Sequence, residues 1–262
     1  MTRPRPEALT ASPEPVEGRG PRIVLVDYGA GNMRSVQRAL EAVGQQPLVT
    51  SDPRDLAGAA GLVLPGVGSA QDAMRALYRL GLVEPLQAYA ASGRPFLGVC
   101  VGQQLLFDGS EEGGGVECLG ILPGTVRRFP PTPGLKVPQI GWNDVWLKYD
   151  HPFVEGVPGG SYFYFVHSYY SEPHQETTLG VAEYGVEFAA IVARDNVVAT
   201  QFHPEKSADL GLRLYANFAR IVADSCHPER SEGSLLSTVK DRERDPSASF
   251  ASLEDRRRLA SG

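Results

Sequence analysis

Pro95-Phe96-Leu97-Gly98-Val99-Cys100-Val101-Gly102-Gln103-Gln104 joins an apolar run to a cysteine framed by glycines, and a helical pattern follows it. An apolar run of this length predicts a buried strand. The glycines at 98 and 102 leave room for a sharp turn from strand to helix. We therefore expect an elbow that exposes the Cys100 thiol at the start of a helix, where the helix dipole favours the thiolate.

The segments before the elbow repeat the order of strand and then helix. The apolar run at residues 23–26 precedes a helical stripe of Val36, Leu40 and Val43, which Gly44 closes. A second run at residues 61–64 precedes a stripe of apolar residues between 70 and 77. Repeated βα units indicate a parallel sheet. We therefore predict an α/β fold with an open, mostly parallel sheet and flanking helices.

After about residue 120 the apolar runs become shorter, which favours antiparallel strands that extend the sheet. The predicted strands cover residues 121–128, 143–147, 162–170 and 178–184. Two more, at residues 188–193 and 197–202, flank Asp195-Asn196, a pair of turn formers typical of a hairpin. The second arm of this hairpin delivers His203. A last helix carries apolar residues on one face between 210 and 221.

The composition indicates one globular domain, at residues 22–224, between two extensions. Residues 1–21 hold five prolines, and residues 225–262 mix charges of both signs with serines, so we expect a disordered N-terminal extension and a disordered or weakly helical C-terminal one. The net charge of −6 argues against nucleic acid as a partner. No apolar stretch reaches the length of about 18 residues that predicts a membrane span. Three cysteines without paired spacing favour a reducing cytoplasm over disulfides or a zinc site.

Cys100 is the predicted nucleophile, because a partly ionised thiol attacks far better than a hydroxyl. Its predicted partners are His203 and Glu205. Pro204 favours extended backbone at the residue before it, and in an extended chain residues i and i+2 face the same side. Glu205 can then accept a hydrogen bond from one ring nitrogen of His203 and turn the other nitrogen toward the sulfur. The three residues form a predicted catalytic triad.

The remaining histidines are rival bases: His151, His167, His174 and His227. His174 and His227 lie in polar segments, and we interpret both as surface residues. His167 lies in the aromatic run at residues 162–170, which favours a structural role, and it is the second choice for the base. Cys118 and Cys226 lack the glycine frame of Cys100, and we interpret both as structural.

Two glycine-containing loops follow predicted strands. Pro65-Gly66-Val67-Gly68 is either an oxyanion hole built from backbone N–H groups or a plain turn, and the local sequence favours the two equally. Tyr28-Gly29-Ala30-Gly31-Asn32 lacks the third glycine of a dinucleotide fingerprint. We therefore predict no nucleotide cofactor there, and no motif predicts any other cofactor or a metal.

Two motifs, Gly98-x-Cys100-x-Gly102-x-Gln104 and His203-x-Glu205, resemble those of the class I glutamine amidotransferases, the triad type. Further segments are similar to one branch of that class, the glutaminase subunits of imidazole glycerol phosphate synthase in histidine biosynthesis. These are residues 27–32, 65–68, 141–143, 164–169 and 203–207. The resemblance covers residues 22–224. It implies an enzyme that hydrolyses glutamine through a cysteine thioester and passes the ammonia to a separate cyclase subunit.

The resemblance also implies roles for single residues. It places the substrate glutamine against Gln104, His167, Ser168 and Tyr169. It assigns the oxyanion donors to Val67, Gly68 and Val101, in a turn that must flip before it acts. It directs four residues toward the partner, a (β/α)8-barrel cyclase in a heterodimer: Asn32, Trp142, Tyr164 and Lys206. Gln103 departs from the family, which usually has a methionine at that position.

Three other interpretations fit parts of the sequence. An amidotransferase of another pathway would share the triad, but the branch-specific segments argue against it. A cysteine hydrolase of the α/β-hydrolase type would share the elbow, but its acid normally precedes its histidine, whereas His203 precedes Glu205 here. A non-catalytic regulatory subunit of the synthase would need no triad, and the intact triad residues weigh against it.

Overall fold

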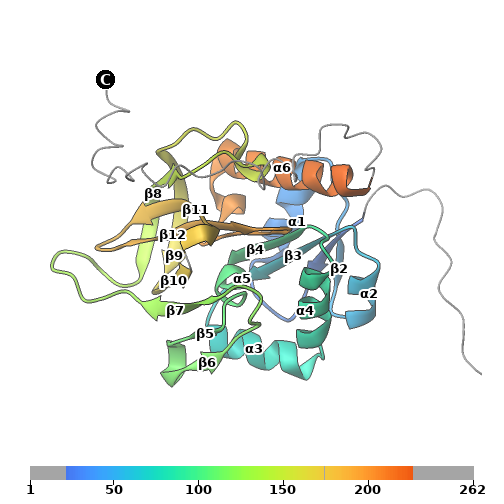
Figure 1. Ribbon diagram of the computed structural model, residues 1–262, viewed down its shortest axis with the longest axis horizontal. Helices are drawn as coiled ribbons and strands as arrows, with labels where there is room; N and C mark the ends of the chain where they lie inside the picture. Colours follow the sequence, from blue (N-terminus) through green and yellow to red (C-terminus); the bar gives the residue numbers. More distant parts are fainter. Residues whose placement is uncertain (1–21, 174, 227–262) are drawn as a thin grey trace, which may run out of the picture.

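A nine-stranded sheet with helices on both faces dominates the computed structural model, which describes residues 22–173 and 175–226 (Figure 1). Its strand order is β2-β1-β3-β4-β13-β12-β11-β8-β9, and a smaller sheet has the order β10-β7-β5-β6. The predicted α/β fold with an antiparallel extension is confirmed. The expected extensions at residues 1–21 and 227–262 lie outside the described residues, as do His174 and His227.

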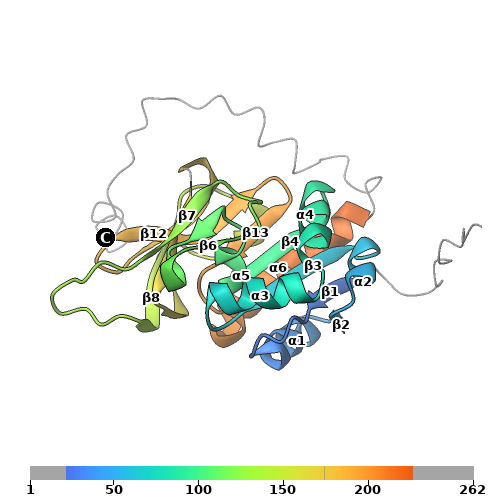
Figure 2. The ribbon, with the colours of Figure 1, turned by 90° about the horizontal axis from the view of Figure 1, so that it is seen from below.

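The parallel half of the main sheet consists of β2-β1-β3-β4-β13, in which neighbouring strands all run parallel. These strands are β1 Ile23–Val26, β2 Leu48–Thr50, β3 Gly61–Gly66, β4 Phe96–Cys100 and β13 Val197–Thr200. Helices α1 (Met33–Ala42) and α6 (Ala208–Cys226) lie on one face of these strands. Helices α3 (Ala70–Arg79) and α4 (Val83–Ala91) lie on the other face (Figures 1 and 2). The short helix α2 (Pro53–Ala57) contacts α4.

The antiparallel half carries the rest of the main sheet. Its strands are β8 Gln139–Leu147, β9 Ser161–His167, β11 Thr178–Glu183 and β12 Glu187–Arg194. The predicted hairpin is confirmed, since β12 pairs with β13 across a turn in which Asp195 has a φ of 52°. Aspartate tolerates this left-handed backbone better than most residues.

The prediction of a single strand over residues 162–170 is wrong. The chain breaks at Ser168 into β9, in the main sheet, and β10 (Tyr169–Pro173), in the smaller one. Strand β10 pairs with β7 (Gly124–Arg128), and the Phe129 N–H donates to the Ser168 carbonyl at the crossing point. A continuous aromatic run therefore serves two sheets, which strand propensity alone does not reveal.

Other boundaries differ from the expected ones. Strand β8 begins four residues earlier than predicted, and β7 begins at Gly124 rather than residue 121. The helix after the elbow, α5 (Val101–Gln104), is a single turn. Short pieces not predicted complete the smaller sheet: β5 Gly109–Ser110 and β6 Val116–Glu117. Helix α6 continues to Cys226, two residues past the expected domain end.

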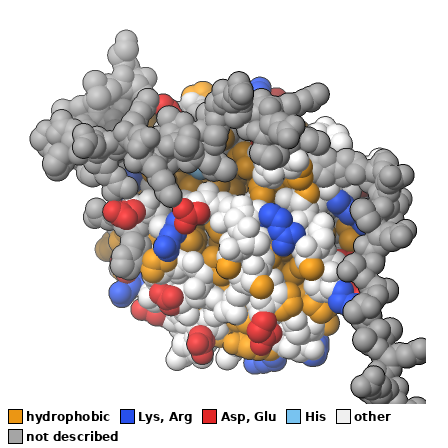
Figure 3. Space-filling view, turned by 45° about the vertical axis from the view of Figure 1, so that its right-hand side comes forward, with side chains coloured by type: hydrophobic (Ala, Val, Ile, Leu, Met, Phe, Trp, Pro, Cys, Tyr) orange, Lys and Arg blue, Asp and Glu red, His pale blue; other side chains and the backbone are white. Residues whose placement is uncertain are grey.

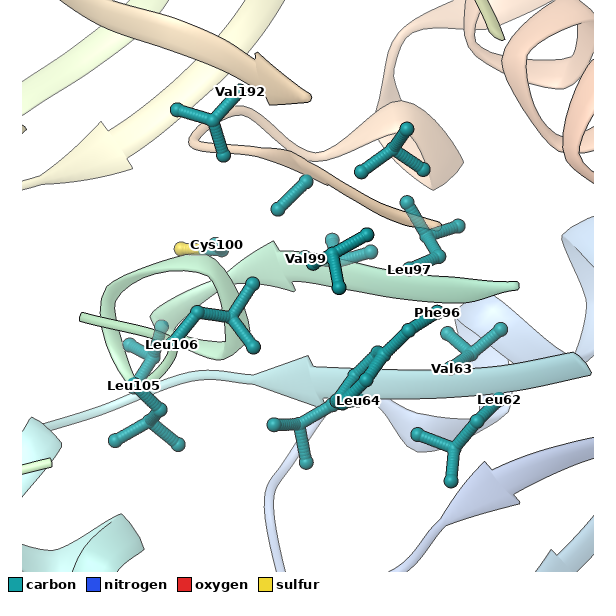
Figure 4. Close-up of a cluster of buried hydrophobic side chains, with 14 of the residues drawn as sticks. Leu62, Val63, Leu64, Phe96, Leu97, Val99, Cys100, Leu105, Leu106 and Val192 are labelled. Carbon is teal, nitrogen blue, oxygen red and sulfur yellow. The ribbon is translucent and has the colours of Figure 1, made fainter. Parts of the chain in front are cut away.

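The elbow lies inside the hydrophobic core (Figure 4). Leucines and valines of β3 and β4 pack around the strand that leads to Cys100, with Leu105 and Leu106 on the turn beyond it (Figure 4). A Cβ at Gly102 would lie 1.9 Å from the Leu64 carbonyl oxygen. Only glycine allows this approach of α5 to β3, so the core itself positions the elbow.

The surface is mixed in character. Acidic and basic side chains lie scattered among apolar and polar ones on the face drawn in Figure 3. Within the described residues, no helix is both long and apolar enough to cross a membrane.

Gly211 allows a test of the close packing of α6 against the Pro204 carbonyl. A Cβ at this position would lie 1.8 Å from the Pro204 carbonyl oxygen in η4 (Pro204–Lys206). We expect Gly211→Ala to lower the free energy of unfolding by about 1–3 kcal/mol, because α6 must move off η4. Urea denaturation measures this change. The control is Gly58→Ala at the end of α2, where a Cβ meets nothing within 4 Å. Equal effects of the two substitutions would refute the close contact.

Candidate active site

Cys100 occupies the strand-to-helix elbow in a strained conformation. Its φ of 56° and ψ of −113° are rare for a residue with a side chain. The expectation of an exposed thiol is wrong, because the residue is only 3% exposed. Its Sγ lies 4.0 Å from the Val166 carbonyl oxygen of β9 and 3.8 Å from Gln201 Nε2. The ends of β9 and β13 therefore cover the thiol that the elbow directs toward them.

His203 and Glu205 come from the loop after β13 and the following η4. His203 Nδ1 lies 2.7 Å from Glu205 Oε1, and the His203 ring also hydrogen-bonds the Cys100 side chain. The His203 N–H donates to the Tyr164 carbonyl of β9 at 2.9 Å, which fixes the backbone. The three residues of the predicted triad are thus in one chain of contacts, in the order thiol, imidazole, carboxylate.

The Glu205 carboxylate is held from three sides. Besides His203 at Oε1, it accepts a hydrogen bond from Asn32 Nδ2 at the same oxygen and one from the Tyr215 hydroxyl at Oε2, 3.3 Å away. Its side chain has no exposed surface. A buried carboxylate is tolerated when donors surround it in this way. Asn32 and Tyr215 bring a loop after β1 and helix α6 to the same charge.

The surroundings of His203 favour its charged form. Burial lowers the pKa of His203, but the hydrogen bonds to Cys100 and Glu205, with their negative charges, outweigh burial and raise that pKa to about 10. The contacts with Cys100 and Glu205 therefore favour the imidazolium over the neutral ring. A protonated imidazole beside the sulfur stabilises a thiolate, the form of cysteine that attacks carbonyl carbon.

His167 is not placed to act as the base. Its Nδ1 lies 2.8 Å from the Tyr169 carbonyl oxygen, and its Nε2 lies 3.0 Å from Gln139 Oε1. Burial lowers its pKa to about 4, and the nearby His203 lowers it further while the bond to Tyr169 opposes the shift. Both ring nitrogens are thus occupied by the protein, and the ring joins β9 to β8 and β10.

Among the predicted substrate residues, Gln104 is linked to the thiol by a chain of hydrogen bonds. Gln104 Nε2 donates to the Tyr169 carbonyl at 3.0 Å and to Gln201 Oε1 at 2.9 Å. Gln201 in turn points its Nε2 at the Cys100 sulfur. Gln104 is therefore linked to the nucleophile through Gln201, a residue that the sequence did not single out. Ser168 lies at the break between β9 and β10.

The predicted oxyanion turn follows β3 directly. Gly66, the last residue of β3, pairs with Cys100, so Val67 and Gly68 begin beside the nucleophile. Gly68 has a φ of 88°, a conformation that favours glycine. The start of α3 lies just beyond, where the Ala70 N–H donates to Glu112 Oε2 at 2.6 Å. Val101, the third predicted donor, begins α5.

Three residues predicted to face a partner lie together on the outer side of β8, β9 and η4. The Trp142 and Tyr164 rings meet edge to face at 6.0 Å, and Lys206 Nζ lies 5.9 Å from the Tyr164 ring centre. Trp142 is 54% exposed, and its neighbours Ile140 and Tyr162 are also exposed. Exposed aromatic and apolar side chains on one strand face are typical of an interaction surface. Asn32, the fourth, is half-buried against Glu205.

Gln103 is fully buried next to the elbow, and neither its amide oxygen nor its amide nitrogen has a hydrogen-bond partner among the described residues. A methionine, which the resemblance leads one to expect there, would leave no such atoms unpaired. Nothing in the structure explains the glutamine.

Sequence reasoning missed Tyr28, Gln201 and Tyr215. Each reaches the site from outside the motif that carries the nucleophile: Tyr28 from the loop after β1, Gln201 from the end of β13, and Tyr215 from α6. The only sequence signal for Tyr215 is a polar group on the apolar face of a helix. That signal does not tell which partner the hydroxyl finds.

Residues 24–221 match the family model described as Glutamine amidotransferase class-I. The chain is 47% identical over 201 residues to the imidazole glycerol phosphate synthase subunit HisH of Dehalococcoides mccartyi, covering 76% of this chain and 97% of that protein. It is 50% identical over 200 residues to HisH of Methanosarcina barkeri, covering 75% and 97%. The chain belongs to the class-I glutamine amidotransferases, in the HisH family.

Solved structures agree with this amidotransferase fold. A crystal structure of a glutamine amidotransferase matches with a TM-score of 0.60 at 21% identity, over 76% of this chain and 98% of that one. PurLQS from Thermotoga maritima matches with a TM-score of 0.61 at 20% identity, over 79% and 100%. At these identities the likeness concerns the fold alone.

Acid is expected to destabilise this amidotransferase through two histidines. Burial lowers the pKa of His151 and of His167 from 6.5 to about 4. Between these values the unfolded chain binds protons that the folded chain does not, so the free energy of unfolding falls as the pH falls from 6.5 to 4. The raised pKa of His203 does not affect stability in this pH range. Its stabilising contribution is complete below pH 6.5 and is lost only as the pH rises toward about 10.

The contribution of His151 to this loss of stability in acid can be measured separately. His151 Nδ1 accepts the Phe153 N–H, and asparagine keeps an acceptor there. We expect His151→Asn to reduce the stability lost between about pH 7 and about pH 4.5 by about 2 kcal/mol, measured by urea denaturation at both pH values. An unchanged loss would show that His151 titrates normally in the folded chain.

Glu205→Gln tests whether the negative charge of Glu205 supports the Cys100 thiolate through His203. Removing the negative charge lowers the pKa of His203, which weakens its support for the Cys100 thiolate. We expect the rate of Cys100 alkylation by iodoacetamide near pH 7 to fall at least about tenfold, followed by mass spectrometry. The control, Glu41→Gln, changes an exposed residue of α1 and leaves the rate unchanged. An alkylation rate in Glu205→Gln equal to that of the wild type would show that Glu205 does not affect the reactivity of the thiol.

Proposed function

We propose that the chain is the glutaminase subunit of an imidazole glycerol phosphate synthase, in which it hydrolyses L-glutamine to glutamate and ammonia. The observation that carries this proposal is the contact chain of Cys100, His203 and Glu205 at the elbow of a HisH-family fold. The branch of the family comes from relatives at 47% and 50% identity whose whole length the chain nearly covers.

The proposed reaction begins with the Cys100 thiolate and the His203 imidazolium. The sulfur attacks the carboxamide carbon of glutamine, and the carbonyl oxygen takes the negative charge. The C–N bond then breaks, the His203 proton leaves with the nitrogen as ammonia, and a thioester remains on Cys100. Water attacks the thioester while His203 accepts its proton, which releases glutamate and restores the ion pair.

The backbone supplies the proposed oxyanion site. The proposed donors are the N–H groups of Val101, which follows Cys100 directly, and of the Val67-Gly68 turn, which follows Gly66, the residue paired with Cys100. Donors aimed at the developing negative charge are typically the largest single contribution to such a reaction. In this proposal the turn changes conformation before it donates, and the partner subunit triggers the change.

The proposed substrate contacts come from Gln104 and from the chain around the strand break, His167, Ser168 and Tyr169. Gln104 and His167 are already tied to the Tyr169 carbonyl. They therefore fix the backbone of this segment. In this proposal Gln104 and His167 support the backbone, and Ser168 and Tyr169 contact the substrate.

The proposed partner is a (β/α)8-barrel cyclase subunit, which forms a heterodimer with the chain and receives the ammonia. It docks on the exposed cluster of Trp142, Tyr164 and Lys206, with Asn32 at the border. This cluster adjoins Glu205 through Lys206 in sequence and through Asn32 by a hydrogen bond. Docking therefore has a short path to the triad. We place the complex in the cytoplasm, where free cysteines such as Cys100, Cys118 and Cys226 stay reduced.

The test is glutamate release with and without a HisH-partner cyclase and its ribonucleotide substrate. We expect slow hydrolysis by the chain alone and at least a tenfold increase in the complex, about 1.4 kcal/mol of barrier. Cys100→Ala should abolish product formation from glutamine but not from ammonium salts. The control is Cys118→Ala, a second buried cysteine outside the site, which should retain both activities. Glutamine use by Cys100→Ala, or an ammonia-dependent defect, would refute the proposed nucleophile.

A further inference from the structure

Tyr28 belongs to the loop after β1, and its buried side chain reaches the end of β3. It is 3% exposed, and its hydroxyl donates a hydrogen bond to the Pro65 carbonyl at 2.9 Å. Pro65 is the penultimate residue of β3, two positions before the Val67-Gly68 turn. None of the sequence motifs gives this tyrosine a role of its own.

The hydroxyl takes a place that the sheet leaves open. Strand β1 pairs with β3 only as far as Leu25 and Val63, whereas β4 continues to pair with β3 up to Gly66. Backbone groups of alternate residues in a strand point to opposite neighbours. Leu62 donates toward the β4 side, so Pro65 directs its carbonyl to the β1 side, beyond the end of the β1 ladder. Tyr28 replaces the missing backbone donor there.

The same loop contacts the turn a second time. A Cβ at Gly31 would lie 3.1 Å from Val67 Cγ2, so the loop backbone packs against the Val67 side chain. A Cβ at Gly66 would lie 2.8 Å from the Tyr28 hydroxyl and 2.6 Å from the Gly102 N atom. The hydroxyl therefore lies where β3, the turn and the nucleophile elbow meet. The loop holds the turn both before it, at Pro65, and within it, at Val67.

The phenol keeps its proton in this position. Burial raises the pKa of Tyr28, and the negative charge of the Cys100 thiolate raises it further. Formation of the thiolate thus does not remove the donor. The bond to Pro65 persists through the ionisation that prepares Cys100 for attack.

We propose that Tyr28 is a positioning residue that holds the Val67-Gly68 turn in its resting conformation, and so sets how strongly glutamine hydrolysis depends on the partner subunit. This inference rests on the proposed function, in which the turn rearranges before it donates. In this proposal the bond to Pro65 is lost when the turn rearranges, so it raises the cost of leaving the resting conformation. Without the hydroxyl, the turn reaches the donating conformation more often in the free chain.

The experiment compares Tyr28→Phe with the full-length wild-type chain, with and without the cyclase subunit and its ribonucleotide. We expect kcat for glutamate release by the free chain to rise about fivefold with KM unchanged, which corresponds to about 1 kcal/mol, the net contribution of one hydrogen bond. The stimulation by the cyclase should fall by the same factor, because the complex already has the rearranged turn.

The matched control is Tyr89→Phe. Tyr89 is also buried, and its hydroxyl faces the Ala59 and Pro95 carbonyls at 3.4 and 3.5 Å, away from the turn. The Tyr89→Phe variant also loses a buried phenol hydroxyl, so it measures the general effect of that loss on the fold. We expect its stimulation ratio to match that of the wild type.

Amide hydrogen exchange on the peptide around Val67 gives a readout independent of activity. Tyr28→Phe should exchange faster there than both the wild type and Tyr89→Phe. Unchanged exchange together with an unchanged stimulation ratio would overturn the role of Tyr28. Absence of stimulation in the wild type would instead overturn the proposed function, while faster exchange in Tyr28→Phe would still support the restraint on the turn.

Discussion

The close approach of α5 to β3 is the constraint on which the site depends. A side chain at Gly102 would strike the Leu64 carbonyl, and one at Gly66 would strike the Gly102 backbone. With no side chain between them, the two backbones place Cys100 opposite Gly66, the residue that precedes the Val67-Gly68 turn. A single methyl group at either glycine would push the nucleophile away from the donors proposed for its oxyanion.

The second constraint is the buried charge of Glu205. A carboxylate with no exposed surface needs donors on each oxygen, and His203, Asn32 and Tyr215 supply them. These donors come from the loop after β13, from the loop after β1 and from α6. The same interactions that satisfy the carboxylate therefore hold three separate segments together, and they support the charge of the imidazolium next to the thiol. Stability and the proposed catalysis share these bonds.

Local patterns predicted the parts of the site that lie close together in the chain. The glycines around Cys100, the βα repeats and the spacing of His203 and Glu205 all act within a few residues, so short-range rules apply to them. Long-range features escaped prediction. The break at Ser168 depends on Phe129, a residue 39 positions away, and the roles of Gln201 and Tyr215 depend on which strands and helices become neighbours. The expected exposure of Cys100 failed for the same reason, because β9 covers it.

The sequence by itself determined the elbow, the strand-then-helix units that begin at β1, β3 and β4, and the direction in which His203 and Glu205 face, whereas β2, α2 and α4 were not predicted. Each follows from backbone geometry over a few residues, which a tertiary neighbour does not easily override. Only the tertiary structure decided that the thiol is buried, that His167 is occupied at both nitrogens, and that Tyr28 and Tyr215 reach the site. Those outcomes depend on which polar groups the strand ladders leave unpaired, because most buried donors and acceptors then find a partner from a distant part of the chain.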